Sequence, residues 1–212
     1  MNFYLFRYIK NKYYSIYTRL SKKKNKKNKN NKFVRTFYST DHNYSTDHKN
    51  KKEEYFIFNG KIEGEYKEYH LNGNLWKIYT YKNNKKEGKY IEYGYDRQLW
   101  EICNYKNNKK DGEYKEYHLN GQLFIIRNYK NDKLEGECKQ YHKNGQLFVI
   151  CNYKNDRLEG EYKSYYDNGQ LQGLCNYKNN KREGIYKGFN NNNQLYMMCN
   201  YKNDKIITFI KL

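Results

Sequence analysis

Residues 111–134 read DGEYKEYHLNGQLFIIRNYKNDKL, and residues 135–158 read EGECKQYHKNGQLFVICNYKNDRL. The same pattern recurs six times in succession with a period of 24 residues. The units are 63–86, 87–110, 111–134, 135–158, 159–182 and 183–206. A glycine holds the second position of every unit: Gly64, Gly88, Gly112, Gly136, Gly160 and Gly184. Repetition at this period indicates an array in which each unit packs on its neighbours.

Each unit has the pattern of a β-hairpin. The central Asn120-Gly121 is a strong hairpin signal, because a type I′ turn needs positive φ at both positions. A second turn is expected at Asn131-Asp132, and runs of Tyr, Ile, Phe and Leu between the turns favour strands. Leu123 and Tyr129 represent two columns that recur in all six units. The pattern predicts an all-β fold, an elongated single-layer antiparallel meander of six 24-residue hairpins.

The pairing of the strands follows from the two turns. A two-residue turn at Asn120-Gly121 pairs Tyr114 with Arg127, and one at Asn131-Asp132 pairs Ile125 with Cys138. One face then carries Tyr114, His118, Leu123, Ile125, Tyr129 and Leu134. The other carries Glu113, Lys115, Tyr117, Phe124, Ile126 and Lys130. With a first strand at 55–58 and a last one at 205–211, we expect roughly 12–14 strands, about 4.8 Å apart, in a twisted array of about 60 Å.

The pattern G-E-Y-K-x-Y-x-x-N-G-Q-L, followed by N-Y-K-N-x-K-x-E-G, resembles MORN repeats. It is similar to the variant found in bacterial antitoxin-like proteins and in large DNA viruses. The resemblance covers about 55–206, and two units depart from it, with Asp96-Arg97 and Asn192-Asn193 in place of Asn-Gly. It implies a hairpin array that binds proteins or phosphoinositide lipids.

The segment before the array differs in composition. Residues 1–54 carry a formal net charge of +11, and residues 55–212 carry +8. Residues 1–20 are predicted to form a short amphipathic helix, and 21–54 a disordered, Lys/Asn-rich basic linker. No apolar run is long enough for a transmembrane helix, and no secretory signal is expected. The stripe that could bind a membrane consists of Phe6, Ile9, Tyr13, Ile16, Tyr17 and Leu20.

Candidate reactive residues follow the repeat. Cys103, Cys151, Cys175 and Cys199 share one column, with neighbours about 9.6 Å apart, too far for a disulfide or a shared zinc ion. The fifth, Cys138, falls opposite Cys151, so a bridge is conceivable there; five free thiols in a reducing cell are the other interpretation. A column of histidines at a strand end has the same spacing: His70, His118 and His142. No catalytic motif is present, and we expect no enzyme activity, no cofactor and no metal.

The repeat surface offers the main candidate for binding. An aromatic column is expected beside a basic one; together they are Trp76, Trp100, Phe124, Phe148, Tyr196, Lys67, Lys115, Lys139 and Lys163. The favoured hypothesis is a non-catalytic scaffold that binds a protein partner, inside the cell in a reducing compartment, either cytoplasmic or membrane-peripheral. The alternatives are a peripheral protein on anionic phospholipid and an antitoxin-like neutraliser. Nucleic-acid binding and self-association through the open sheet edges are further hypotheses.

Overall fold

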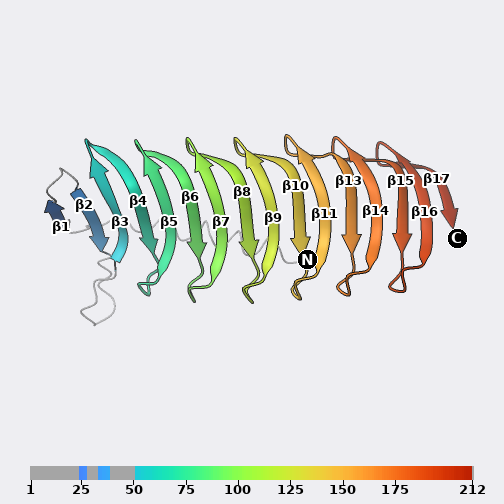
Figure 1. Cartoon of the computed structure of the whole chain (residues 1–212), viewed down its shortest axis with the longest axis horizontal. Helices are drawn as coiled ribbons and strands as arrows, with labels where there is room; N and C mark the ends of the chain where they lie inside the picture. Colours follow the sequence, from blue (N-terminus) through green and yellow to red (C-terminus); the bar gives the residue numbers. More distant parts are fainter. Residues whose placement is uncertain (1–23, 28–32, 39–50, 212) are drawn as a thin grey trace.

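The computed structural model describes residues 24–27, 33–38 and 51–211. They form one antiparallel sheet in which neighbouring strands follow each other in chain order (Figure 1). The strands are β1 (Lys24–Lys27), β2 (Phe33–Tyr38), β3 (Lys51–Phe58), β4 (Lys61–Tyr69), β5 (Leu75–Lys82), β6 (Lys85–Tyr93), β7 (Leu99–Lys106), β8 (Lys109–Tyr117), β9 (Leu123–Lys130), β10 (Lys133–Tyr141), β11 (Leu147–Lys154), β12 (Arg157–Leu158), β13 (Gly160–Tyr165), β14 (Leu171–Lys178), β15 (Lys181–Phe189), β16 (Leu195–Lys202) and β17 (Lys205–Lys211). Only Glu159 separates β12 from β13, so these two form one interrupted strand. The predicted all-β meander is confirmed, and the helix predicted within 1–20, with its apolar stripe, lies outside the described residues.

The array begins earlier than the sequence predicts. Part of the region 21–54 that we predicted to be a linker forms strands β1 and β2, and β3 starts at Lys51 instead of residue 55. Strand β2 pairs with β3 from Phe33 opposite Ile57 to Tyr38 opposite Lys51. Its sequence FVRTFY is rich in the aromatic and β-branched residues that favour strands, whereas the surrounding Lys and Asn conceal this signal. At the other end, β17 coincides with the predicted last strand.

The Asn-Gly turns differ from the prediction. His118 N–H donates to Gln122 O (2.8 Å) and Gly121 N–H donates to His118 O (2.9 Å), which closes a three-residue loop. Only the glycine has positive φ (83°), so the predicted type I′ turn is wrong here; three-residue hairpin loops commonly place glycine at this position. A β-bulge at Phe124 follows, since Leu123 pairs with Tyr117 and the next pair is Ile125 with Glu116. The loop is one residue longer than predicted, which shifts the pairing by one residue, and the bulge shifts it back by one. Tyr114 therefore still pairs with Arg127, as predicted.

The two departing units keep the same loop. Gly94 N–H donates to Gln98 O (2.7 Å), and Arg97 takes the positive φ (69°) that glycine holds elsewhere. In the last unit Asn193 does so, with φ of 58°. The hairpin therefore forms without glycine at this position, although a residue with a Cβ is sterically strained at positive φ.

The type I′ turns lie at the second site of each unit. Asn131 and Asp132 both have positive φ (52° and 69°), and Lys130 pairs with Lys133. Beyond Gly136, which has φ of 85°, the pairing moves by two residues, so Cys138 faces Arg127 instead of the predicted Ile125. A shift of two residues preserves the face of every side chain, so this incorrect pairing leaves the predicted faces of Cys138 and Leu134 unchanged. The bulge at Phe124 has the opposite effect: Leu123 pairs with Tyr117 on the face of Lys115, and Phe124 packs on the face of Tyr114, so both lie opposite to the prediction.

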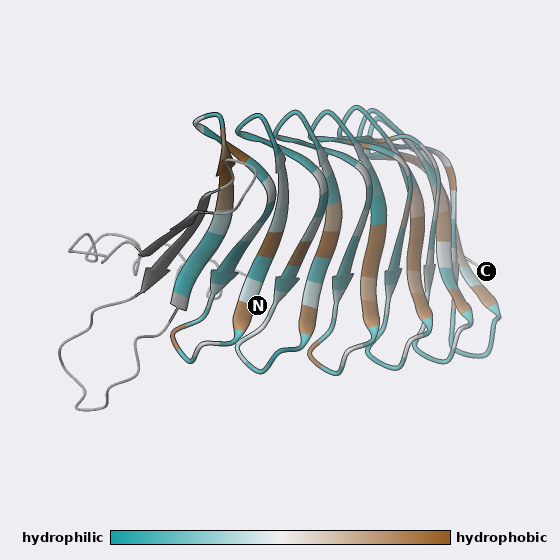
Figure 2. Ribbon diagram, turned by 60° about the vertical axis from the view of Figure 1, so that its left-hand side comes forward, coloured by the Kyte–Doolittle hydropathy of each residue, from teal (hydrophilic) through white to brown (hydrophobic). Residues whose placement is uncertain are grey.

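The sheet has two faces and two long edges. We call the face with the Tyr129 column the tyrosine face and the face with Lys115 the lysine face. The edge with the type I′ turns, at the top of Figure 1, is the turn edge, and the edge with the three-residue loops, at the bottom, is the loop edge. Figure 2 shows that the sheet is curved, with apolar residues along the strands and hydrophilic residues at the turn edge.

The core lies on the tyrosine face. Its buried members are Tyr79, Tyr90, Cys103, Tyr114, Ile125, Cys138, Val149 and Cys151. Within a hairpin two tyrosines meet edge to face, as Tyr114 does with Tyr129 at a centroid distance of 5.6 Å. Such a pair contributes about 0.5–1.5 kcal/mol beyond its buried area. Because the contact recurs between Tyr90 and Tyr105 and between Tyr186 and Tyr201, ring packing replaces the missing second layer.

Candidate binding surfaces

At the turn edge, side chains tie each unit to the one before it. Asp132 Oδ1 accepts from Lys110 N–H (2.7 Å), and Glu135 Oε2 accepts from Asn155 N–H (2.9 Å). The first type of bond is repeated by Asn84, Asn108, Asp156, Asn180 and Asp204. The second is repeated by Glu63, Glu87, Asp111, Glu159 and Glu183. Successive turns are therefore held in a fixed spatial relation.

A second ladder runs along the loop edge. His118 Nε2 lies 3.0 Å from Tyr141 O, and Asn120 Nδ2 donates to Lys143 O (2.9 Å). His70 and His142 make the equivalent contact with the following unit, and Tyr166 replaces the histidine by donating its hydroxyl to Phe189 O (2.9 Å). The histidine column thus lies at the strand ends beside the loops, where it links units.

The cysteines lie on the tyrosine face. All five are free and buried, and Cys138 is the direct cross-strand partner of Cys151, as predicted. Burial raises the pKa of Cys103 to about 12 and that of Cys175 to about 11. The pKa of Cys138 is lowered, because the thiol of Cys151 hydrogen-bonds to it and Arg127 lies near. Among the described residues, no three His, Cys, Asp or Glu side chains gather closely enough to hold a metal ion.

Arg127 was predicted only as the cross-strand partner of Tyr114, and its place among the tyrosine rings was not predicted. It occupies the cysteine column, with its guanidinium 4.5 Å from the ring centroid of Tyr114 and 5.3 Å from that of Tyr129. Its Nε is buried without a hydrogen-bond partner in the described part of the chain. Its position in a column of cysteines was the available signal.

The tyrosine face changes character along the array. In the second unit the carboxylate of Glu92, which is 5% exposed, accepts hydrogen bonds from Tyr90 and Trp76. The corresponding column reads Glu68, Glu92, Glu116, Gln140, Ser164 and Gly188. Burial raises the pKa of Glu68. The face therefore begins with partly buried carboxylates and ends with uncharged, small side chains.

The structure separates the two columns that we predicted to lie side by side. Lys115 lies on the lysine face and pairs with Glu113 (2.6 Å), and Lys67, Lys139 and Lys163 form equivalent pairs. Phe124 packs against the buried cluster of the tyrosine face. The bulge explains this difference, because the extra residue reverses the alternation that would have put Phe124 beside Lys115. Trp76, Trp100, Phe148 and Tyr196 occupy the same bulge position.

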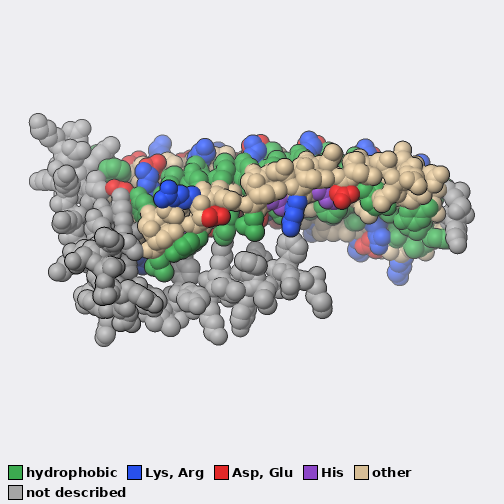
Figure 3. All heavy atoms as spheres, turned by 90° about the horizontal axis from the view of Figure 1, so that it is seen from below, with side chains coloured by type: hydrophobic (Ala, Val, Ile, Leu, Met, Phe, Trp, Pro, Cys, Tyr) green, Lys and Arg blue, Asp and Glu red, His purple; other side chains and the backbone are tan. Residues whose placement is uncertain are grey.

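These rings extend to the loop edge. Phe124 lies 4.8 Å from the ring of His118, and Phe148 lies 4.7 Å from that of His142. Phe148 and Tyr196 are 37% and 46% exposed. Large apolar residues at the loop tips are more exposed still, as Leu119 is at 74%. We define the loop-edge strip as Leu71, Tyr95, Leu119, Phe148 and Tyr196. Figure 3, which looks onto this edge, shows hydrophobic and histidine side chains among the loops.

A protein-family model matches five of the six 24-residue units. The model of the MORN repeat variant matches residues 62–83, 110–131, 134–155, 158–179 and 182–203, and the chain belongs to this family. The unmatched unit is the one with Asp96-Arg97 in its loop. Curated proteins gave no match. MORN repeats are commonly protein or membrane interaction modules. In the described part of the chain, no helix is long and apolar enough to cross a membrane.

Proposed function

We propose that this chain is a non-catalytic scaffold that binds a protein partner through the loop-edge strip. The observation that carries the proposal is the exposure of large apolar side chains along one edge of the array, with Tyr95 56% and Leu119 74% exposed. Leu71, Tyr95 and Leu119 lie at equivalent positions of three successive loops and form one exposed apolar row, and contiguous exposed apolar surface commonly marks a protein interaction site.

The surroundings of the strip support this role. His118 and His142 tie successive loops together through backbone carbonyls, so the exposed residues are presented on a fixed frame. A preorganised surface loses less conformational entropy on binding than a mobile one. With five free thiols, the chain fits a reducing compartment inside the cell.

The test is affinity capture with a matched pair of variants. The loop-edge variant carries Leu119→Ser, Phe148→Ser and Tyr196→Ser. The control carries Ile185→Ser and Ile207→Ser, which also remove apolar side chains at least half exposed but lie away from the loops. We expect quantitative mass spectrometry to show proteins captured by wild type and control and lost by the loop-edge variant. Identical captured sets in all three would overturn the proposal.

Peripheral binding to anionic membranes is the second candidate. It is favoured by the exposed lysines of the turn edge, since each basic residue near an anionic surface contributes about 1 kcal/mol. Co-sedimentation with anionic and neutral liposomes at two salt concentrations tests it. The full chain is compared with one lacking residues 1–23, a deletion that leaves every described strand intact. Equal binding by both chains supports a contact through the turn edge, whereas binding only by the full chain assigns the contact to the first 23 residues. Absence of binding by both chains removes the candidate.

A further inference from the structure

The turn edge carries pairs of like charges. Lys130 and Lys133 flank a type I′ turn and are direct cross-strand partners. Every one of the six type I′ turns between Lys82 and Lys205 has such a pair. The twelve residues, which we call the turn-edge ridge, are Lys82, Lys85, Lys106, Lys109, Lys130, Lys133, Lys154, Arg157, Lys178, Lys181, Lys202 and Lys205. All are exposed.

The ridge cations lack the ion pairs that other lysines have. Lys115, on the same face, is neutralised by Glu113 at 2.6 Å. In the described part of the chain no ridge residue forms an ion pair, and only Arg157 donates a side-chain hydrogen bond, to Asn179 Oδ1 (3.1 Å). Like charges directly opposite each other destabilise a sheet. Each unit therefore bears an electrostatic cost at this position that no ion pair within the described residues offsets.

Carboxylates lie near the ridge, but they accept hydrogen bonds from backbone N–H groups and, among the residues that the structure describes, form no ion pairs with ridge residues. Asp111 Oδ2 accepts from Asn131 N–H (3.2 Å), as Glu135 and Glu159 do from the turns that follow them. The aspartates of three turns, Asp132, Asp156 and Asp204, accept from backbone N–H groups of the preceding unit. Together with Glu63, Glu87 and Glu183, nine acidic residues lie along the turn edge. The ridge has twelve basic residues, so positive charge remains in excess there.

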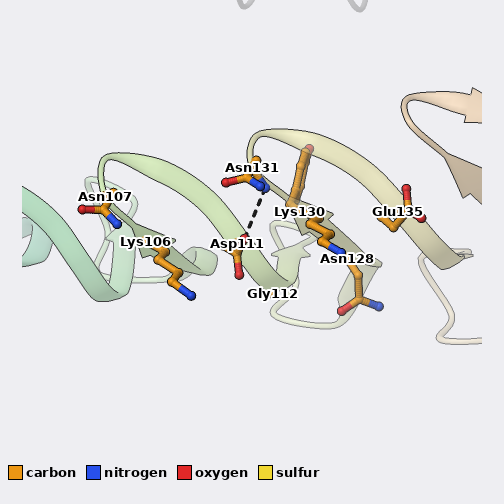
Figure 4. A pocket seen from close by; sticks show the side chains of 9 residues that line it. Lys106, Asn107, Asp111, Gly112, Asn128, Lys130, Asn131 and Glu135 are labelled. Atoms are coloured by element: carbon orange, nitrogen blue, oxygen red, sulfur yellow. Dashed lines mark hydrogen bonds between the residues drawn. The ribbon is translucent and has the colours of Figure 1, made fainter.

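Shallow hollows separate successive turns. One, of about 480 Å³, is lined by Lys106 and Lys130 and also by Asp111, Glu135 and Tyr129 (Figure 4). These two lysines extend in the same direction in Figure 4, and Asp111 between them points to Asn131. A second hollow, of about 410 Å³, is lined by Lys133, Lys154 and Arg157 together with Glu159, which accepts a hydrogen bond from Asn179 N–H. The cations thus border recesses that a side chain of a bound segment can enter.

The two ridge positions are basic in every unit, whereas the position that follows them varies in character. The residue before the turn is Lys in all six units. The residue after the turn is Lys in five units and Arg157 in the fourth. The residue after the second ridge position reads Lys86, Lys110, Leu134, Leu158, Arg182 and Ile206. A Lys-rich composition alone would not keep one column basic in every unit while its neighbour varies. The recurring charge therefore belongs to the ridge positions themselves.

We propose that the turn-edge ridge binds an extended acidic segment of a protein, with Asp or Glu at every third residue. Equivalent cations of successive units lie two strands apart, about 9.6 Å. A polyproline II segment returns to the same face every three residues, after about 9.3 Å. One acidic side chain therefore meets one pair of cations per unit along a ridge of about 48 Å. This site is independent of the loop-edge strip.

The geometry favours a peptide over two other anions. A bilayer surface extends in two dimensions, whereas the turns form a single row in Figure 1, so the ridge matches an extended chain better than an anionic membrane. Single-stranded nucleic acid gains affinity from bases stacked on aromatic rings. The column beside the ridge on the lysine face is Thr80, Asn104, Asn128, Asn152, Asn176 and Asn200, without a ring.

The test is fluorescence anisotropy with the full chain and two labelled peptides. One has the sequence (Glu-Pro-Ser)6, and the other has the same composition with its glutamates grouped together. The ridge variant carries Lys82→Gln, Lys106→Gln, Lys130→Gln and Lys154→Gln. The control carries Lys67→Gln, Lys115→Gln, Lys139→Gln and Lys163→Gln, which lowers the net charge equally but acts on ion-paired lysines.

We expect the periodic peptide to bind wild type about tenfold more tightly than the grouped peptide, since several weak ion pairs must form together. The ridge variant should lose about tenfold in affinity for the periodic peptide, and the control about twofold or less. Unchanged melting temperatures show that both variants are folded. Equal binding of the two peptides, or equal losses in the two variants, would overturn the proposal. So would a loss of binding to phosphatidylserine vesicles or single-stranded RNA in the ridge variant that exceeds its loss of binding to the periodic peptide.

Discussion

Asp132 and Lys110, 22 residues apart, are joined by two hydrogen bonds: Lys110 N–H donates to Asp132 Oδ1 (2.7 Å), and Asp132 N–H donates to Lys110 O (2.9 Å). The side chain of a turn thus completes the backbone pairing of the preceding unit. The bond from the backbone N–H to the turn side chain recurs at six turns, with Asn or Asp as acceptor. The turns therefore set both the hairpin and the spacing of neighbouring hairpins.

This bond can be removed without straining the turn. Asp132→Gly keeps the positive φ and deletes the acceptor, so we predict a loss of about 0.5–1.5 kcal/mol of stability. Asp132→Asn retains an acceptor oxygen and should stay within about 0.5 kcal/mol of wild type. Hydrogen exchange should be faster at the Lys110 amide in the glycine variant alone. Equal exchange in both variants would show that the side chain does not hold this amide.

The glycine of the three-residue loop is predicted to be more sensitive than an exposed lysine. Gly121 has φ of 83°, a conformation that costs a β-branched residue at least about 1–2 kcal/mol. Gly121→Val should therefore lower the melting temperature more than Lys130→Ala does. Thermal unfolding followed by circular dichroism measures both, and equal melting temperatures would contradict the assigned loop.

The partly buried carboxylate of Glu68 predicts an unusual pH dependence. Burial raises its pKa, so the folded state holds the proton to higher pH than the unfolded chain does. Its contribution is then most favourable below the unfolded pKa and is lost as pH rises through the folded pKa. Glu68→Gln should raise the melting temperature at pH 7, and the difference should shrink near pH 4. A lower melting temperature for the variant at pH 7 would mean that attraction to Lys77 outweighs desolvation.

Cys138 and Cys151 are predicted to form the array's preferred disulfide under mild oxidation. Direct cross-strand partners have Cα atoms about 4.5–5.5 Å apart, within the range of a disulfide, whereas Cys151 and Cys175 are equivalent residues two strands apart. Diamide treatment followed by alkylation and peptide mass spectrometry should detect the Cys138–Cys151 crosslink. Cys138→Ser should abolish it without creating another. A crosslink between Cys151 and Cys175 would contradict the register.

The repeat period predicts most of the fold, since Gly, Tyr and Leu columns recur at 24-residue intervals. The pairing of Tyr114 with Arg127 was predicted correctly for an incomplete reason: a longer loop and a bulge offset each other. The pairing of Ile125 with Cys138 was wrong because the bulge at Gly136 has no distinct mark beyond the glycine itself.

The candidate surfaces were less predictable than the fold. Alternation along a strand puts Phe124 beside Lys115, but the bulge turns the ring to the other face. The ridge was recognisable as a column of lysines, but the absence of ion pairs depends on side-chain positions that the sequence does not specify. Strands β1 and β2 were hidden by the Lys and Asn content of their surroundings.

The central claim is that the two long edges are separate binding surfaces. Affinity capture with wild type, the loop-edge variant and the ridge variant, compared in one mass-spectrometry experiment, tests it most directly. We predict that the loop-edge variant loses a set of proteins that the ridge variant retains, and that the ridge variant loses an acidic set that the loop-edge variant retains. Loss of the same proteins in both variants, or of none in either, would contradict the account.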